Sequence, residues 1–271
     1  METSRQSSAA SLYREGLPFV VEMARQADLV DVAKLRSASY GKHIPSLGSA
    51  LQKPEDCDYE LGCEVIVARS KFDGTLLGTL RTHTNAFKPL PLQMSLRLPE
   101  RFANARMVEA TRLCVKGSPN ASLVRSALFK ALFQYCEAQN VDWMMAAGRR
   151  PVDRIYDALL FSDVVESGKF YPMAHAGGVL HRVMSLAPSE ARVTWKASEH
   201  PLYRFVIETR HDDVDLSAMT SLHFPWTYPK VDTESDSSLA PLSDFTPISR
   251  FGDLTTVDID LSTPLHHRFN A

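Results

Sequence analysis

The residues of this chain with the clearest chemical potential lie in two predicted neighbouring strands in its middle. Glu109 and Arg112 fall within an apolar segment, 107–115, whose composition predicts a buried strand. Arg81 and His83 share one face of the preceding predicted strand. A carboxylate can act as a general base, and a guanidinium can bind an anion through two parallel hydrogen bonds. These residue types therefore suit proton transfer beside an anion site.

Glu109 and Arg112 pose a geometric problem, because residues three apart on a regular strand point to opposite faces. They can serve one site only if an extra residue, a β-bulge, lies between them. We therefore predict a bulge in this strand. The alternative for Glu109 is an ion pair with Arg112 or Arg81 that only shapes the sheet.

The elements that position these residues follow from hydrophobic periodicity and turn residues. The clearest helix covers 122–141, where a narrow polar stripe is typical of a helix packed on a sheet. A hairpin covers 63–83, with its turn at Asp73-Gly74. The other expected elements are strands at 18–24, 142–147, 178–187 and 204–209, helices at 27–42 and 151–161, and loops at 44–62 and 85–106. The pattern is α/β with a mixed sheet.

Composition and charge exclude several classes of protein. The 271 residues are 44% hydrophobic and 23% charged, with a net charge of −2, so a nucleic acid partner is not expected. The four cysteines form no CxxC pair and no His cluster has zinc spacing, so we expect free thiols and no metal site. No apolar run is long enough for a transmembrane segment, and no signal peptide is apparent, so the expected location is cytoplasmic.

A resemblance to a known family emerges from residue 107 onward. The strand 107–115, helix 122–141, strand 142–147 and helix 151–161 follow the order of the GNAT acyltransferase core. The segment 155–161 resembles the family's Tyr-x-x-x-Gly-Phe ending, with Leu160 in place of the glycine. The resemblance implies a GNAT fold: an α/β architecture with a mixed, mostly antiparallel sheet, helices on both faces and splayed central strands.

Further motifs narrow the resemblance to two groups within that fold. The run Val-Glu-Ala-Thr-Arg-Leu-Cys-Val at 108–115 is similar to a strand shared by acyl-homoserine lactone synthases and long-chain N-acyl amino acid synthases. The segment 78–84, the acidic stretch 55–60 and the pair Arg36 and Tyr40 resemble other segments of these groups, so that the resemblance covers 17–187. It implies transfer of a fatty acyl group from acyl carrier protein to the α-amine of an amino acid, by direct attack on the thioester.

The resemblance also implies roles for individual residues. Glu109 is the candidate base for the acceptor amine, and Tyr156 is the candidate acid for the departing thiolate, with a tyrosine merely packed on the sheet as the alternative. The substrate-binding candidates are Arg81, Arg112, Arg36 and His83, with Asp56 or Asp58 for the ammonium. The alternative for this acidic loop is that its carboxylates are only solvated. The backbone of the splayed strand is expected to pair with the pantetheine arm at Leu113, Cys114, Val115 and Lys116.

The absence of a glycine-rich loop from the sequence bears on the identity of the acyl donor. The stretch 116–125 has no run of glycines of the kind that wraps the pyrophosphate of CoA at a helix N-terminus, which favours acyl carrier protein over CoA. Such carriers are acidic, so Arg125, Arg149, Arg150 and Arg154 are candidates for a docking patch, or else belong to a solvated face. A divergent loop that still binds CoA is the alternative, and no tightly bound cofactor is expected.

Three other functions remain open at this point. They are an acyl-homoserine lactone synthase with S-adenosylmethionine as acceptor, an acyl-CoA N-acetyltransferase, and a non-catalytic acyl-binding module. The length of the chain and the absence of tryptophan before Trp143 disfavour the first of these. The expected organisation is a flexible tail at 1–16, a GNAT-like domain at 17–190, a packed extension at 191–230 and an extended arm at 231–271, which is a candidate homodimer contact.

Overall fold

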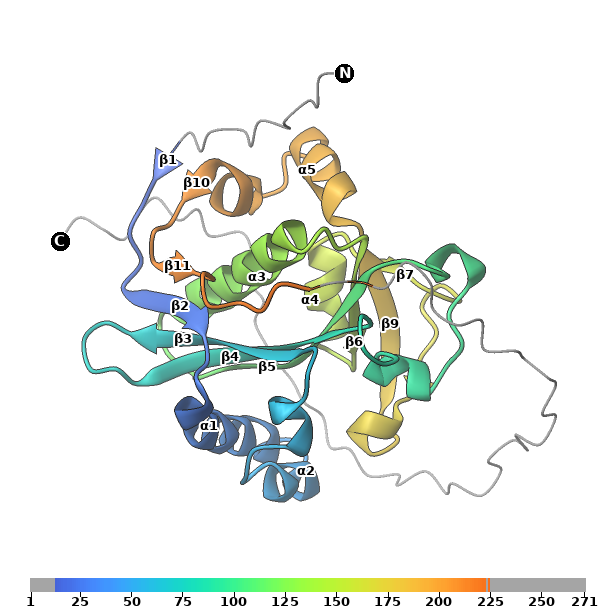
Figure 1. The fold of residues 1–271 in the computed structure, drawn as a ribbon, viewed down its shortest axis with the longest axis horizontal. Coiled ribbons are helices and arrows are strands. Elements are labelled where there is room, and N and C mark those ends of the chain that lie inside the picture. Colours follow the sequence, from blue (N-terminus) through green and yellow to red (C-terminus); the bar gives the residue numbers. More distant parts are fainter. Residues whose placement is uncertain (1–12, 223, 225–271) are drawn as a thin grey trace. The chain divides into compact units, whose positions relative to one another are not determined.

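A computed structural model describes residues 13–222 and 224 of the chain. The main sheet has the strand order β11-β2-β3-β4-β5-β6-β9-β7 (Figure 1). The short strand β8 also pairs with β9. The strands are β1 (Tyr13–Arg14), β2 (Phe19–Met23), β3 (Cys63–Ser70), β4 (Leu76–Thr84), β5 (Met107–Val115), β6 (Trp143–Gly148), β7 (Ser162–Asp163), β8 (Tyr171–Pro172), β9 (Leu180–Leu186), β10 (Thr209–Arg210) and β11 (Val214–Asp215).

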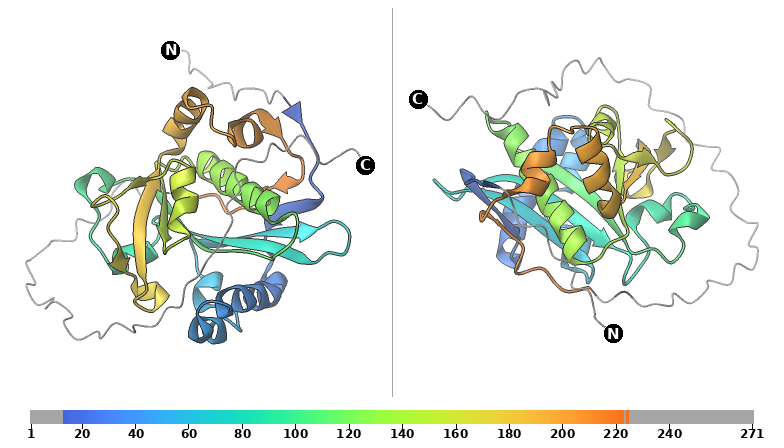
Figure 2. Two further views of the ribbon diagram at one scale, coloured as in Figure 1. Left: turned by 180° about the vertical axis from the view of Figure 1, so that it is seen from behind. Right: turned by 90° about the horizontal axis from the view of Figure 1, so that it is seen from above.

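Helices cover both faces of this sheet (Figures 1 and 2). α1 (Leu29–Gly41) contacts β4 and β5 from one face, with α2 (Pro45–Ala50) beside it. α3 (Ala121–Ala138) contacts β3, β4 and β5 from the other face, where α4 (Asp153–Ala158) and α5 (Pro188–Ala197) also lie. Within the main sheet the strands pair antiparallel except for β5 with β6 and β2 with β11. The arrangement confirms the predicted mixed, mostly antiparallel sheet with helices on both faces.

The larger hydrophobic core lies between the sheet and α3. Alternate residues of the strands, such as Ile66, Leu80 and Val108, pack against the apolar side of α3. Trp195 of α5 is fully buried and stacks on Phe133 of α3, with 5.8 Å between ring centroids. Burial of such large apolar surfaces supplies the main stabilisation of this layer.

The face of the sheet under α1 is different, because its buried residues are largely polar and charged. Val65 and Val67 of β3 form a small apolar cluster there with Leu29 and Val32. Next to it, β4 and β5 bury Arg81, His83, Glu109 and Arg112. The candidate site residues therefore lie beneath α1.

The predicted β-bulge is present in β5. Thr111 pairs with Arg81 and Cys114 pairs with Thr79, so that Arg112 and Leu113 both lie opposite Leu80. Arg112 has a φ of 53°, the left-handed conformation that accompanies one common kind of bulge. The extra residue shifts the alternation of β5 by one position, and this shift brings Arg112 to the face that carries Glu109.

The predicted separation of the central strands is also present. β5 and β6 pair in parallel from Met107 with Trp143 as far as Ala110 with Ala146, and the described pairing ends there. β5 continues to Val115 along β4 alone, and β6 continues to Gly148 along β9 alone. The bulge lies directly after the last pair, which explains why the two strands diverge at this point.

Two segments differ from the expected elements. The loop expected at 44–62 contains α2 and a 3-10 turn, Asp56–Tyr59. The strand expected near 204–209 is wrong, because Arg204–Glu208 forms a π-helical turn and only Thr209–Arg210 is extended. Phe205 and Val206 are adjacent and both buried. A turn of helix can bury two consecutive side chains, whereas a strand with one face in solvent buries only every second side chain.

A buried lysine holds this C-terminal segment on α3. Lys130 is fully buried, and its Nζ donates to the carbonyl oxygens of Phe205, at 2.8 Å, and of Thr209. Its Nζ also lies 2.9 Å from Nδ1 of His211. Burial lowers the pKa of Lys130 to about 8. These contacts join residues about eighty positions apart and anchor the segment that follows α5.

Lys130→Met should lower the free energy of unfolding by about 2–4 kcal/mol, because buried carbonyl groups lose a charged donor while the side-chain volume is kept. Chemical denaturation monitored by circular dichroism measures this change. Lys34→Met is the matched control, since Lys34 is exposed on α1 and, among the described residues, pairs only with Asp31. A change below about 0.5 kcal/mol for Lys130→Met would contradict the anchoring role.

Part of the expected domain organisation lies outside the described residues. Of the tail at 1–16 the structure describes 13–16, where β1 pairs in parallel with β10. Of the extension at 191–230 it describes α5 and the segment up to 222 and 224, and the arm at 231–271 lies outside it. Within the described part of the chain, none of the helices combines the length and the apolar character that crossing a membrane would require.

Candidate functional site

The site is built on cross-strand neighbours of β4 and β5. Arg81 lies opposite Thr111 and His83 lies opposite Glu109. Alternation along each strand places all four side chains on the face beneath α1. Nε of Arg81 donates to the hydroxyl of Thr111 over 3.1 Å, which fixes the direction of the guanidinium.

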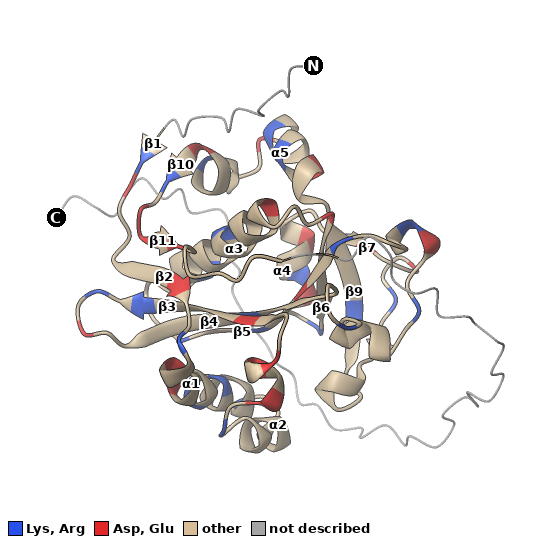
Figure 3. Cartoon of the chain, viewed as in Figure 1, with Lys and Arg blue, Asp and Glu red and all other residues tan. Residues whose placement is uncertain are grey.

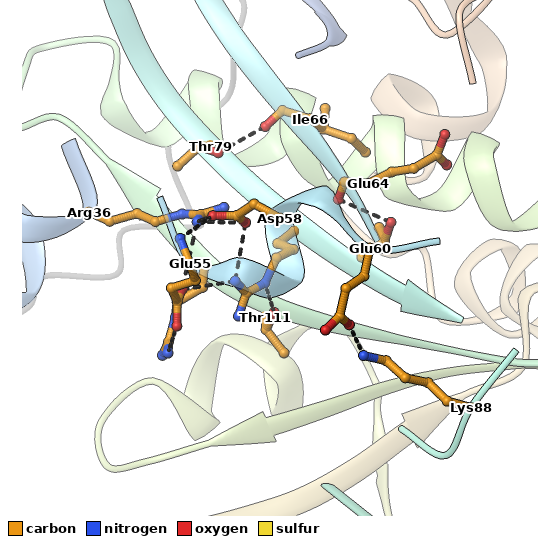
Figure 4. A network of polar contacts seen from close by, with 12 residues as sticks. Arg36, Glu55, Asp58, Glu60, Glu64, Ile66, Thr79, Lys88 and Thr111 are labelled. Carbon is orange, nitrogen blue, oxygen red and sulfur yellow. Dashed lines mark hydrogen bonds and ion pairs between the residues drawn. The ribbon is translucent and has the colours of Figure 1, made fainter. Parts of the chain in front are cut away.

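A network of ion pairs joins this face to α1 and to the loop that precedes β3 (Figure 4). Arg36 of α1 donates from Nη1 to both carboxylate oxygens of Asp58, at 2.9 and 2.8 Å. Nη1 of Arg81 donates to Asp58, at 3.1 Å, and to Glu55, at 2.8 Å. Arg112 forms two hydrogen bonds with Glu55, at 2.9 Å from Nε and 2.6 Å from Nη2. Three arginines thus share two carboxylates.

This arginine network, formed by Arg36, Arg81, Arg112, Glu55 and Asp58, carries an excess of positive charge. Arg36 is 1% exposed, and its Nε and Nη2 are buried without a partner among the described residues. Burial would raise the pKa of Glu55, but the hydrogen bonds of Arg112 and the nearby guanidinium charges lower it to about 2. Glu55 is therefore ionised at neutral pH, and the network retains one uncompensated positive charge.

Glu109 is the most deeply buried acidic residue beside this network. It is 0% exposed, and its Oε2 accepts the backbone N–H of Leu92 at 2.9 Å. Its Oε1 has no partner among the described residues. Burial raises the pKa of Glu109 to about 8, against the lowering effects of the Leu92 hydrogen bond and of Arg81. A carboxyl group with such a pKa can take up and release a proton near neutral pH.

Two histidines lie near Glu109. His83 is 3% exposed, and neither of its ring nitrogens has a partner among the described residues. His175 belongs to the short turn Ala174–Ala176, and its Nδ1 is likewise buried without a described partner. Burial lowers the pKa of His83 to about 3 and that of His175 to about 4, so both imidazoles are neutral at physiological pH.

Tyr156 comes from α4, which follows the separated end of β6. Its ring packs on Phe161, with 5.3 Å between ring centroids, and also lines the larger core. A Cβ on Gly148 would lie 3.1 Å from this ring, so the glycine lets α4 approach β6 closely. Burial, followed by the charge of Glu109, raises the pKa of Tyr156 to about 12, which keeps its hydroxyl protonated. Leu160 has a φ of 62°, the left-handed conformation that the glycine of the related motif adopts easily.

The segment of β5 beyond the bulge has only β4 as a neighbouring strand. Leu113 and Val115 pack against the larger core, whereas Cys114 lies on the opposite face and is 4% exposed. Burial raises the pKa of the Cys114 thiol to about 11, which disfavours the thiolate that a nucleophilic role requires. Lys116 is exposed and donates its backbone N–H to Leu77 at 2.7 Å.

The basic residues expected to dock a carrier protein lie close to the ends of the separated strands. Arg149 and Arg150 follow β6, and Arg154 is exposed on α4. Arg125 lies in the first turns of α3, which begins shortly after β5, and burial lowers its pKa. α4 carries basic and acidic residues together (Figure 3). These four arginines are thus near the strand ends without forming a uniformly basic surface.

The structure brings together most of the residues singled out in the sequence. Arg36, Arg81, Arg112 and Asp58 form the network, and His83 lies beside Glu109, whereas Asp56 is exposed. Sequence reasoning missed the central position of Glu55 and the presence of His175. The acidic stretch at 55–60 was a signal for the former, but no signal in the sequence placed His175 near β4.

The comparison with protein families decides the identity. The family model described as "N-acyl amino acid synthase FeeM" matches residues 31–184, which include α1, the acidic loop, β3 to β6 and most of β9. The chain belongs to this family. Membership makes the protein an acyltransferase, and it agrees with the observed GNAT arrangement of a mixed sheet with diverging central strands.

Comparisons with solved structures report similar folds at low identity. FeeM from uncultured soil microbes has 14% identity and a TM-score of 0.48, covering 64% of this chain and 98% of its own. BjaI, a CoA-dependent acyl-homoserine lactone synthase, has 14% identity and a TM-score of 0.47, covering 74% and 96%. Aminoglycoside 6'-acetyltransferase type Ii has 11% identity and a TM-score of 0.44, covering 62% and 97%. No curated protein matches the chain. Similarities of this size do not determine a substrate.

Proposed function

We propose that this member of the FeeM family joins a long-chain acyl group, carried as a thioester on acyl carrier protein, to the α-amine of an amino acid in the cytoplasm. The observation that carries the proposal is the arrangement around the separated strands. A buried carboxyl group with a free oxygen, Glu109, lies between a positively charged network and a strand segment that has lost one neighbour. An amine, a carboxylate and an extended pantetheine arm are the groups that these three features suit.

The acceptor's carboxylate is assigned to the arginine network. Glu55 and Asp58 neutralise only two of the three guanidinium groups, so a further anion relieves the remaining charge. Nε and Nη2 of Arg36 are donors that lack a described partner. The direct use of Asp58 to hold the acceptor's ammonium is not favoured, because Arg36 and Arg81 already occupy its two oxygens.

The proposed reaction needs three proton transfers, two from the acceptor nitrogen and one to the departing sulfur. Glu109 takes a proton from the acceptor's ammonium, and the free amine attacks the thioester carbonyl to give a tetrahedral oxyanion, which backbone N–H groups of β5 stabilise. When the carbon–sulfur bond breaks, Tyr156 protonates the departing thiolate. The proton that the nitrogen loses during collapse balances the one that Tyr156 gives up. The charge of Glu109 contributes to the raised pKa of Tyr156, which supports assigning the two groups to one site.

The full-length protein, incubated with a C16 acyl carrier protein and a mixture of amino acids, tests the proposal. Mass spectrometry should show a new N-acyl amino acid and free carrier protein in equal amounts. Formation of an acyl-homoserine lactone when S-adenosylmethionine is added would overturn the choice of acceptor. Absence of any product with both acyl carrier protein and acyl-CoA would overturn the proposed function.

The choice of donor is tested by reversing charge near the separated strands. Arg149→Glu with Arg150→Glu should raise KM for acyl carrier protein by about tenfold or more and leave KM for acyl-CoA within about threefold, because carrier proteins are acidic. Steady-state kinetics with both donors measures the effect. Lys53→Glu, the same charge reversal at an exposed position in the loop before β3, is the control. An equal rise for both donors would contradict docking of a carrier at these arginines.

A further inference from the structure

Several polar atoms beside the proposed acyl-transfer site lack partners although they are buried. They are both ring nitrogens of His83, Oε1 of Glu109 and Nδ1 of His175, and none of them has a hydrogen bond to another described residue. Most buried polar side-chain atoms in proteins are hydrogen-bonded, because an unpaired one costs free energy. Four such atoms in one neighbourhood indicate that their partner comes from outside the described part of the chain.

The register of the sheet brings these residues together. His83 is the cross-strand partner of Glu109, and side chains in such pairs are direct neighbours. His175 reaches the same region from the connection between β8 and β9. Its turn, Ala174–Ala176, contacts the turn Pro91–Met94, which includes the Leu92 that donates to Glu109 at 2.9 Å. The proximity of His175 also contributes to the lowered pKa of His83. Three separate parts of the chain therefore converge beside Glu109.

The chemistry of this group selects for a neutral ligand. With pKa values near 3 and 4, His83 and His175 are uncharged at neutral pH. His83 then offers one donor and one acceptor, whereas the N–H of His175 is bonded to the backbone of Pro91, so that Nδ1 of His175 offers an acceptor. The adjoining apolar cluster includes Leu92, Met107 and Met173. A charged group would be poorly solvated there, while a purely apolar group would leave the imidazole nitrogens unpaired.

We propose that His83 and His175 recognise the side chain of the acceptor amino acid, and that this side chain carries an uncharged hydrogen-bonding group. The inference rests on the proposed function and names the acceptor class for the same site. In this arrangement Glu109 takes the proton from the α-amine, and the two histidines hydrogen-bond the side chain of the same amino acid. A site built to hydrogen-bond a substrate group discriminates strongly against an analogue that lacks it.

Pairs of amino acids of similar shape test this selectivity. With the full-length protein and a fixed acyl donor, kcat/KM is compared for threonine against valine, asparagine against leucine, and tyrosine against phenylalanine. In at least one pair, kcat/KM of the polar member should be higher by about tenfold or more. Buried polar groups that an analogue leaves unpaired can give discrimination of about 10⁴-fold. Equal or faster reaction of the apolar member in all three pairs would overturn the inference.

His175→Leu provides the matched variant. It should lower kcat/KM for the preferred polar acceptor by about tenfold and leave that of its apolar counterpart within about twofold, because only the hydrogen bond is lost. His175→Gln, which keeps hydrogen-bonding atoms, should retain part of the preference, and the exposed His43→Leu should change neither rate. Equal losses for both acceptors in His175→Leu would show a merely structural role and overturn the inference.

The two levels of the hypothesis fail in different ways. If no amino acid is acylated with either donor, the proposed function and this inference are both wrong. If amino acids are acylated without any preference for the polar members, the proposed function stands and only the inference is wrong.

Discussion

Replacing Glu55 with alanine should lower the free energy of unfolding by about 3–5 kcal/mol, the range seen when one partner of a buried ion pair is removed. The Glu55 carboxylate accepts two hydrogen bonds from Arg112 and one from Arg81, and its side chain is only 23% exposed. Without it, three guanidinium groups share the single carboxylate of Asp58. The expected loss is large because positive charge is left buried and unpaired.

Denaturant titration at neutral pH measures this loss, and Glu60→Ala is the matched control. Glu60 lies in the same acidic loop, is exposed, and within the described part of the chain forms an ion pair only with the exposed Lys88. Its removal should cost less than about 1 kcal/mol. If both variants lose equally little, the arginine network does not depend on Glu55.

The dependence of the free energy of unfolding on pH in the acidic range gives a second measurement of the contribution of Glu55. The folded pKa of Glu55 is about 2, below its ordinary value of 4.5. A lowered pKa contributes stability that is fully present above pH 4.5 and is lost as pH falls through about 2. The Glu55→Ala variant should therefore lose less of its remaining stability than the wild type over this interval.

Much of the fold follows from local patterns. The strand expected at 107–115 matches β5 residue for residue, and the hairpin and α3 lie within a few residues of their predicted bounds. Each of these elements repeats one hydrophobic period over many residues, so local sequence determines it. The bulge was predictable for another reason: two polar residues three apart on one strand cannot otherwise serve one site.

The site was less predictable, because its parts meet from distant segments. Glu55 pairs with Arg112, fifty-seven residues away, through a loop whose sequence shows no periodicity. The sequence suggested that Arg81 and Arg112 were free to bind a substrate carboxylate, yet both are paired with Glu55. A buried arginine needs an internal counter-charge, and which acidic residue supplies it depends on the path of the loop.

The same reasoning explains the error at 204–209. A strand was expected there, but the carbonyl groups of Phe205 and Thr209 turn toward Lys130, which comes from the middle of α3. A buried ammonium group requires several acceptors, and a π-helical turn presents them together. This long-range requirement outweighs a short local pattern.

Glu109→Gln should lower kcat/KM by about 10²–10⁴-fold, the usual contribution of a general base. Glutamine has nearly the same shape and can still accept the Leu92 hydrogen bond, so the fold should be retained. Since the pKa of Glu109 is about 8, the wild-type rate should rise with pH up to that value, and the variant should lack this rise. Rates with 3-fluoroalanine, which keeps the α-carboxylate but whose amine has a lower pKa than that of alanine, separate the titration of Glu109 from that of the acceptor.

The stability of the same variant distinguishes a catalytic Glu109 from one that only shapes the sheet. A pKa raised from 4.5 to about 8 means that the stability contributed by the protonated carboxyl is full below pH 4.5 and is lost as pH rises through about 8. Glu109→Gln removes the ionisation, so it should be at least as stable as the wild type at pH 9. The exposed Glu190→Gln should change neither rate nor stability. If Glu109→Gln keeps its activity within about threefold but unfolds more easily at every pH, then Glu109 acts by holding β4, β5 and the Leu92 turn together, and proton transfer must be assigned to another group.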